Sequence, residues 1–179
     1  MKKYLIITIS ALLFATACNH KTHREFRSAD NSIVATTDYI GDDSLHASWQ
    51  FTDRDGNPLV PQCDSLRVTE LGPDGHPVSV CFYVGDSQRW LQFYSTMVVR
   101  SDGVVRNGLR EGLWVFYFPN GNKQTEYTFL LGREEGPYKV FRENGIPYYI
   151  GQCREGRRVG VWEIYNDDGT LAITKDYGD

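Results

Sequence analysis

The chain has 179 residues, a formal net charge of −4 and only four histidines. This length accommodates one domain, with room for a small second lobe. The acidic balance argues against a nucleic-acid partner, because contact with phosphates requires a basic surface. No cofactor motif and no metal-ligand spacing stand out, so we expect no cofactor, no metal site and no enzymatic activity.

The first segment, residues 1–17, has the pattern of a secretory signal peptide. Two lysines precede an apolar run, residues 4–15, that is shorter than the roughly 18 residues a membrane-spanning helix needs. Three small residues ending at Ala17 lead into Cys18 and resemble the lipobox of bacterial lipoproteins. The resemblance implies that Cys18 carries lipid, and the alternative is an ordinary cleavage site. We therefore expect a membrane-anchored lipoprotein of the cell envelope, periplasmic or surface-facing.

Residues 18–43 are polar and rich in Ser, Thr, Asp and Asn, and we interpret them as the lipidated cysteine and a flexible tether. The tether is expected to be disordered at least to Asn31, with a possible first strand from Ile33. Loss of the leader leaves 17 basic against 23 acidic residues, a formal net charge of −6. Membrane contact should therefore come from the lipid and not from a basic face.

Residues 44–103 are predicted to form an N-terminal β region. Short runs rich in Val, Phe and Tyr alternate there with turn residues, and Asp-Gly steps at Gly56 and Gly75 indicate hairpins with type I′ turns. Trp90 lies 24 residues before Trp114, which begins the same pattern later in the chain. Two interpretations stay open: a decayed continuation of the hairpin series that follows, or an unrelated small β lobe.

Three cysteines follow the lipid cysteine in what should be an oxidising compartment. Cys63 and Cys81 flank a hairpin-like segment and are the candidate pair for a disulfide, although a turn centred on Asp74 places them out of register. Cys153 occupies the repeat position held by Phe129, so we interpret it as a small buried apolar residue.

Residues 104–179 contain one pattern written three times with a period of 24 residues, which is typical of a repeat array. The recurring glycines are Gly108, Gly132 and Gly156, then Gly112, Gly136 and Gly160, then Gly121, Gly145 and Gly169. The recurring aromatic residues are Trp114, Tyr138 and Trp162, then Tyr117, Phe141 and Tyr165. We predict an all-β fold, an elongated antiparallel meander of repeated β-hairpins preceded by a smaller β region.

Alternation along the middle copy puts Tyr138 and Val140 on one face of a strand, and Lys139 and Phe141 on the other. The first face is apolar in every copy and is predicted to face the core. A two-residue turn at Asn144-Gly145 and its equivalents would pair Val140 with Tyr149, Phe116 with Thr125, and Ile164 with Ile173. The Gly-x-x-x-Gly segments are predicted to be tight, charged links between hairpins.

On the second face, Tyr117, Phe141 and Tyr165 recur once every two strands, a spacing of about 9 to 10 Å. Such a row could stack on a glycan or accept an extended protein segment, so it is the candidate ligand or partner face. The alternative is that the N-terminal region covers this face and the row is a second core layer.

A catalytic or zinc site would have to rest on His46 or His76, because His20 and His23 lie in the tether. Both candidates lie beside turns and have no ligand spacing. We interpret them as solvated loop residues.

The run Tyr149-x-Gly151-x4-Gly156-x3-Gly160-x-Trp162-x2-Tyr165-x3-Gly169 resembles the MORN repeat, and more closely its bacterial variant. The resemblance extends over about residues 104–175. It implies consecutive antiparallel hairpins in one elongated sheet and a role as a scaffold, an interaction surface or a lipid contact. Bacterial members are often labelled antitoxin components, but an antitoxin meets its toxin in the cytoplasm and this chain carries an export signal.

Our preferred interpretation is a lipid-anchored, non-enzymatic β-repeat protein of the cell envelope that presents a surface to an envelope protein partner. A glycan-binding module that uses the aromatic row is the second interpretation, and an antitoxin-like component is the third.

Overall fold

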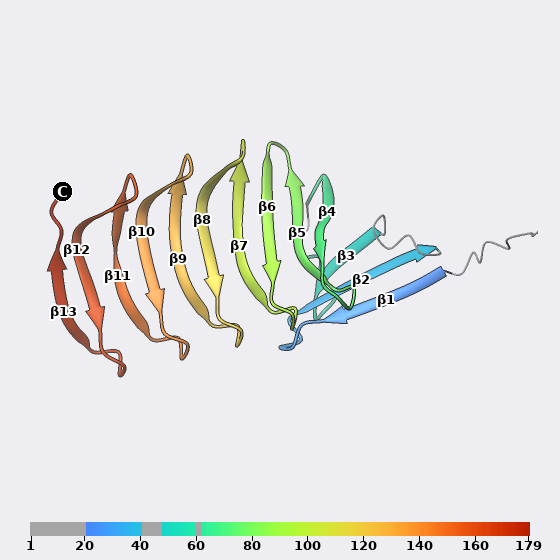
Figure 1. Ribbon diagram of the computed structural model, residues 1–179, viewed down its shortest axis with the longest axis horizontal. Helices are drawn as coiled ribbons and strands as arrows, with labels where there is room; N and C mark the ends of the chain where they lie inside the picture. Colours follow the sequence, from blue (N-terminus) through green and yellow to red (C-terminus); the bar gives the residue numbers. More distant parts are fainter. Residues whose placement is uncertain (1–20, 41–47, 60–61) are drawn as a thin grey trace, which may run out of the picture.

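The computed structural model describes residues 21–40, 48–59 and 62–179, which form an all-β molecule of two antiparallel sheets (Figure 1). The small sheet has the order β1-β2-β3, and the large sheet has ten strands in the order β13 to β4. Each strand of the large sheet pairs with its neighbours in sequence, so the predicted meander of hairpins is confirmed. The strands are β1 (Lys21–Arg27), β2 (Ile33–Ile40), β3 (Ser48–Asp53), β4 (Ser65–Leu71), β5 (Pro77–Val84), β6 (Ser87–Phe93), β7 (Val99–Arg106), β8 (Leu109–Tyr117), β9 (Lys123–Leu130), β10 (Arg133–Phe141), β11 (Pro147–Arg154), β12 (Arg157–Tyr165) and β13 (Leu171–Asp176).

The small sheet packs across the N-terminal end of the large sheet, and the two enclose the main hydrophobic core (Figure 1). Phe51 of β3 is central to this core, since its ring stacks on Phe93 at 6.1 Å and meets Phe82 edge-on at 6.0 Å. The buried core residues are Ile33, Ala35, Trp49, Phe51, Val80, Phe82, Leu91, Phe93 and Met97. We call this part the two-layer end.

Strand β1 and the β1–β2 turn lie in residues 21–31, which were predicted to be a disordered tether, so that prediction is wrong, whereas the strand expected from Ile33 is present as β2. β1 pairs with β2 along its whole length, and Phe26 packs against the core. The β1–β2 turn is closed at Asp30, whose carboxylate accepts hydrogen bonds from Ser28 and from the backbone and side chain of Ser32. The polar composition of the segment concealed the few apolar side chains that line one face of the hairpin.

The N-terminal β region divides between the two sheets. β3 belongs to the small sheet, whereas β4 to β7 continue the meander into the repeats. The turns at residues 72–76 and 94–98 have the same backbone hydrogen bonds as the repeat turn at residues 118–122. Continuation of the hairpin series therefore holds from Ser65 onward, and the strands before it form a separate lobe.

The two ends of the repeat hairpins have different turns, and both differ from the prediction. Gly145 donates to the Arg142 carbonyl and Arg142 donates to the Ile146 carbonyl, which describes a three-residue loop with Gly145 at positive φ. The Ile146 N–H donates to Oδ1 of Asn144, and Asn144 itself does not have positive φ. The predicted two-residue turn at Asn144-Gly145 is wrong, and so are the type I′ turns predicted at Gly56 and Gly75, which have the same three-residue hydrogen bonds.

The type I′ geometry occurs at the other end of the hairpins. Asn107 and Gly108 both have positive φ, as do the equivalent pairs Leu131 with Gly132 and Glu155 with Gly156. The Gly-x-x-x-Gly segments are therefore not separate links, because the first glycine ends a turn and the second lies inside a strand at a shift in register.

The predicted pairings of Val140 with Tyr149, Phe116 with Thr125 and Ile164 with Ile173 are all confirmed. A bulge beside each three-residue turn absorbs the extra residue, so the register comes out as expected. The two faces of each strand are consequently those that the alternation predicted.

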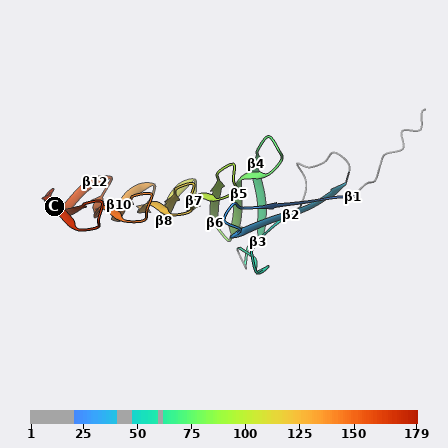
Figure 2. The same ribbon diagram turned by 90° about the horizontal axis from the view of Figure 1, so that it is seen from below.

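Strands β8–β13 form a single layer, which is apparent when the molecule is seen from below (Figure 2). Among the described residues, the substantial contacts of these strands are with their neighbours in the sheet. The face predicted to be the core is therefore not covered by a second layer here. We call this part the single-layer end.

Candidate functional site

The side chains of the predicted core face form a continuous aromatic ladder across the single-layer end. The ladder consists of Trp114, Phe116, Tyr127, Tyr138, Trp162 and Tyr177. Successive ring centroids along it are separated by 6.2, 5.4, 5.3, 5.4 and 6.1 Å. Such spacings are those of favourable ring contacts. These rings, and not a second sheet, cover this face of the single-layer end. We call this face of the sheet the aromatic face.

Two glycines allow the tryptophans of the ladder to lie against the sheet. A Cβ on Gly151 would lie 2.2 Å from Cδ2 of Trp162, so the indole occupies the space above this glycine. The indole N–H donates to the Gln152 carbonyl at 3.2 Å. Because Gly151 has no side chain, Tyr138 on β10 also reaches Trp162 across β11.

The first repeat contains the same arrangement. A Cβ on Gly103 would lie 2.1 Å from Cδ2 of Trp114, whose indole N–H donates to the Val104 carbonyl at 3.0 Å. In the middle repeat both positions change together, because Tyr127 and Tyr138 stack with centroids 5.3 Å apart. A large ring over glycine and two medium rings side by side are thus alternative ways to fill the same space.

Arginine side chains lie over both tryptophans. The Arg110 guanidinium carbon is 4.5 Å from the Trp114 ring centroid, and that of Arg158 is 4.6 Å from the Trp162 centroid. Such cation–π contacts contribute about 0.5 to 1 kcal/mol at exposed sites. The equivalent residue of the middle repeat is Glu134, so this position alternates in charge along the ladder.

The central rings of the ladder are the ones a partner can touch. Trp114 and Trp162 are only 6% and 2% exposed, whereas Phe116, Tyr127 and Tyr138 are half-buried. Burial raises the pKa of both Tyr127 and Tyr138, so both stay protonated at neutral pH and can donate a hydrogen bond. The middle of the aromatic face is therefore apolar with polar tips, which is the composition of many binding surfaces.

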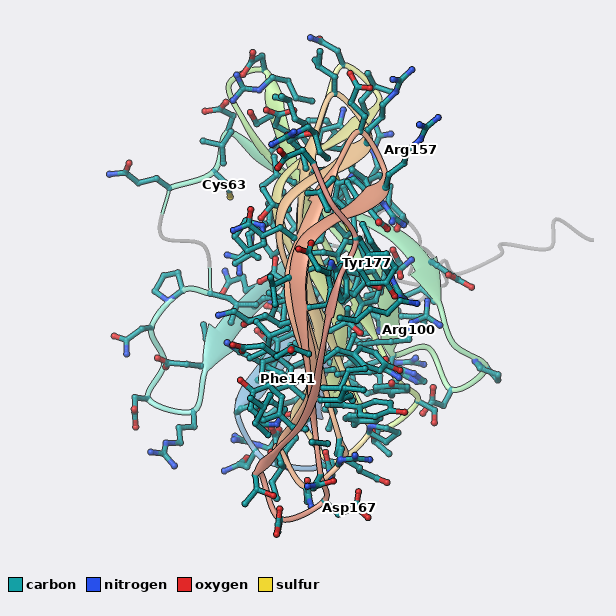
Figure 3. All side chains as sticks on the ribbon, turned by 90° about the vertical axis from the view of Figure 1, so that its left-hand side faces the viewer. Cys63, Arg100, Phe141, Arg157, Asp167 and Tyr177 are labelled. Atoms are coloured by element: carbon teal, nitrogen blue, oxygen red, sulfur yellow. The ribbon has the colours of Figure 1, made fainter. Side chains whose placement is uncertain are left out.

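The predicted row of Tyr117, Phe141 and Tyr165 lies on the opposite face, which we call the row face, and all three rings are half-buried. Burial raises the pKa of Tyr117, and its backbone carbonyl accepts a hydrogen bond from the Tyr94 hydroxyl at 2.7 Å. Side chains project from both faces when the molecule is viewed along its long axis (Figure 3).

The small sheet covers the row face only at its N-terminal end. It contacts that face through Val80, Phe82, Leu91 and Phe93 of β5 and β6. The three rings of the row lie farther along, on β8, β10 and β12, where no described element packs over them. The Tyr165 hydroxyl donates to the Glu163 carboxylate at 2.6 Å on this face.

The candidate disulfide is not formed, since Cys63 and Cys81 are both free. Ser65 pairs with Tyr83, so Cys63 lies near the end of β5 while Cys81 pairs with Arg67. Cys81 is buried and Cys63 exposed, and burial raises the pKa of the Cys81 thiol.

The lone thiol of the repeats behaves as the sequence predicted. Cys153 is buried at 5% exposure, and burial raises the pKa of its thiol too. Cys18 lies outside the described residues, so its lipid modification stays a prediction.

His76 is not a solvated loop residue, contrary to the prediction. It is 4% exposed, its Nδ1 is bonded to the Asp74 carboxylate, and its ring fills the space above Gly72. His23 is exposed and bonded to Asp38, while His20 and His46 lie outside the described residues. Within residues 21–40, 48–59 and 62–179, no group of three or more His, Cys, Asp or Glu is placed to hold a metal ion.

In the described part of the chain, no helix has the length and apolar composition needed to cross a bilayer.

Comparison with known protein families finds a match within the repeats. Residues 110–130 match the family model of the MORN repeat variant. The matched segment runs from Arg110 to Leu130, which is most of the first repeat hairpin, β8 and β9. No curated protein matches the chain. The matched repeat and the all-β repeat fold together fit a repeat scaffold or interaction surface.

Proposed function

We propose that this protein is a lipid-anchored scaffold of the cell envelope, without enzymatic activity, that binds a protein partner on its aromatic face. The observation that carries the proposal is the ladder itself, which runs unbroken from Trp114 to Tyr177 on a side of the sheet that no described element covers. A contiguous row of aromatic rings that is partly exposed on a protein surface marks an interaction site.

The anchor and the location are proposed from the sequence. The basic residues, the short apolar run and the small residues before Cys18 support export and lipid attachment. Substitution Cys18→Ser should move the protein from the membrane fraction to the soluble fraction. An unchanged distribution would contradict the anchor without affecting the aromatic face.

The partner proposal is tested by photo-crosslinking from adjacent residues on opposite faces. A benzophenone amino acid is introduced at Tyr127 or Tyr138, on the aromatic face, or at Glu126 or Lys139, on the row face. Because each pair is adjacent in sequence, chain position and expression are matched, and only the direction of the probe differs.

We expect the two aromatic-face probes to crosslink the same envelope protein and the two row-face probes to fail. Equal crosslinking from both faces would indicate non-specific capture. Crosslinking from the row face alone would show that the partner binds the row face and not the aromatic face. Either result would overturn the proposal.

A further inference from the structure

One position of the repeat has an arginine in two copies and a glutamate in the third. The three residues lie 24 apart on β8, β10 and β12 and are Arg110, Glu134 and Arg158. Glu134 pairs with Phe129 of β9, whose ring contacts that of Tyr127, so the Glu134 side chain lies on the aromatic face. The two arginines lie on the same face, because each guanidinium lies over a tryptophan of the ladder.

The first and third repeats thus supply a cation to their own rings. The Arg110 guanidinium carbon is 4.5 Å from the Trp114 ring centroid and 5.2 Å from that of Phe129. The Arg158 guanidinium carbon is 4.6 Å from the Trp162 centroid and 5.7 Å from that of a second ring, Tyr177. These contacts show that a guanidinium fits against the rings of this face. The middle repeat has rings but no arginine of its own at this position.

The Glu134 carboxylate has no cation beside it in the described part of the chain. Glu134 is half-buried, and none of the ion pairs that the described residues form within 4 Å includes it. Burial, and after it the charge of Glu134, raises the pKa of both the Tyr138 hydroxyl and the Cys153 thiol. Both neighbours are therefore neutral at pH 7, and the negative charge of the carboxylate is left to water.

A guanidinium suits these acceptors better than an ammonium. Its planar fork can donate two parallel hydrogen bonds to one carboxylate, and it has further N–H groups for a second acceptor. The Tyr138 hydroxyl can accept one of these, since a phenol oxygen both donates and accepts. The flanking Arg110 and Arg158 lie on strands about 9 to 10 Å from β10, so a run of basic residues would meet their charges.

We propose that the aromatic face binds a single arginine side chain of its partner at Glu134, with the Tyr138 hydroxyl as the second acceptor. The partner's guanidinium takes the place that the chain's own arginines take in the first and third repeats. This inference rests on the proposed function, because it names the chemistry of the partner for the same face.

The direct test is an NMR titration of the full chain with Nα-acetyl-arginine amide. Nα-acetyl-citrulline amide is the comparator, since it has nearly the same shape without the charge. We expect the arginine probe to shift the resonances of Glu134 and Tyr138, and the citrulline probe to bind at least about tenfold more weakly, a difference of about 1.4 kcal/mol. Equal binding of the two probes, or no binding of the arginine probe, overturns the proposal.

Two neighbouring glutamates provide matched variants. Glu134→Gln removes the charge and keeps the shape, so the affinity for the arginine probe should fall at least about tenfold. Glu135→Gln removes the same charge one residue away, where the carboxylate accepts the Glu155 N–H at 2.8 Å, and should leave the affinity unchanged. Equal losses in the two variants would mean general charge attraction and no site at Glu134.

A third variant fills the site from within. Glu134→Arg installs the residue of the other two repeats and should abolish binding of the arginine probe. Circular dichroism spectra show whether the sheet is intact in every variant. Binding as tight as in the wild type by a folded Glu134→Arg protein would place the probe elsewhere.

Photo-crosslinking from Tyr127 separates this inference from the proposed function. In the Glu134→Gln background the crosslink to the partner should fall at least about tenfold, and in the Glu135→Gln background it should persist. A crosslink that persists in both would contradict the arginine contact and leave the partner on the aromatic face. Absence of any aromatic-face crosslink in the wild type would contradict the proposed partner, while the titration still decides whether Glu134 binds a guanidinium.

Discussion

The two-layer end and the single-layer end bury their large apolar side chains in different ways. At the two-layer end, apolar side chains from β3 and β6 meet between two sheets, and Phe93 is 1% exposed. At the single-layer end, Trp162 reaches almost the same burial, 2%, with no second sheet over it. The Trp162 ring packs on Gly151 of the neighbouring strand β11, and the Arg158 guanidinium lies over it. A repeat whose rings cover its own backbone can dispense with a second layer, and this leaves its faces available for binding.

The largest expected difference between the two ends is in the loss of stability when a phenylalanine is replaced by alanine. Phe93→Ala removes a fully enclosed side chain and should lower the free energy of unfolding by about 3 to 5 kcal/mol. Phe116→Ala removes a ladder ring that is only half-buried, so it should lower the free energy of unfolding by about 1 to 2 kcal/mol. Urea denaturation followed by circular dichroism measures both. Equal losses would mean that the single-layer end encloses its rings as fully as the two-layer end does.

A double-mutant cycle tests how the single-layer end packs. Gly151→Tyr alone places atoms where the Trp162 indole lies and should destabilise the protein by about 1 to 3 kcal/mol. Gly151→Tyr combined with Trp162→Tyr reproduces the Tyr127 and Tyr138 pair of the middle repeat. We expect the double variant to recover at least about 1 kcal/mol relative to the sum of the single variants. Additive effects would show that the two positions do not share one space.

The turns give a smaller effect of the opposite sign. Leu131 has a φ of 49° in a type I′ turn, where its 71% exposed side chain gains little from packing. Asparagine tolerates this conformation, so Leu131→Asn should stabilise the protein by about 1 kcal/mol. The matched reverse change, Asn107→Leu at the equivalent turn, should destabilise by a similar amount. Thermal unfolding measures both, and a loss of stability in Leu131→Asn would contradict the turn assignment.

The smallest effect is a dependence on pH at the β1–β2 turn. Burial acts to raise the pKa of Asp30, but hydrogen bonds from Ser28 and Ser32 outweigh it, and the net pKa is lowered. A lowered folded-state pKa gives stability that is present above the unfolded value of about 3.9 and is lost as the pH falls through the folded value. Asp30→Asn should therefore be less stable than the wild type at pH 7, and the difference should shrink below about pH 4.

Urea denaturation at pH 7, 5 and 3 checks this prediction, with Asp168→Asn as the counterpart at the single-layer end. Asp168 has a pKa lowered by hydrogen bonds from the Thr170 side chain and backbone. A destabilisation by Asp30→Asn that is the same at pH 3 as at pH 7 would rule out the carboxylate as its source.

Much of the single-layer end could be predicted from the sequence, because the 24-residue period indicates both the register of the strands and the face on which each side chain lies. The glycine and aromatic repeats predicted the pairing of Val140 with Tyr149, and the alternation of Tyr138 with Lys139 predicted the two faces. The turn type could not be predicted as safely, because Asn-Gly satisfies either a two-residue or a three-residue loop. Only the hydrogen bond from the Ile146 backbone to the Asn144 side chain distinguishes them.

The two-layer end was harder to predict because it has no period. β1 contributes Phe26 to the core from an otherwise polar strand, so composition gave no sign of it. The burial of His76 likewise depends on which strands cross above it. A signal for the ladder was present: Gly103 and Gly151 each precede a tryptophan by eleven residues, whereas the middle repeat has tyrosine at both positions.

The order of strands from β4 to β13 also determines how the molecule would respond to force. The strands run across the long axis of the large sheet, so the hydrogen bonds between them point along it (Figure 1). A pull along this axis loads one strand pair after another in series, as in a zipper, and not all pairs together in shear. Each repeat interacts mainly with its neighbours, so hairpins would peel away singly at low force. The single-layer end would lengthen in steps under tension while the two-layer end, where a second sheet bridges the strands, stayed folded.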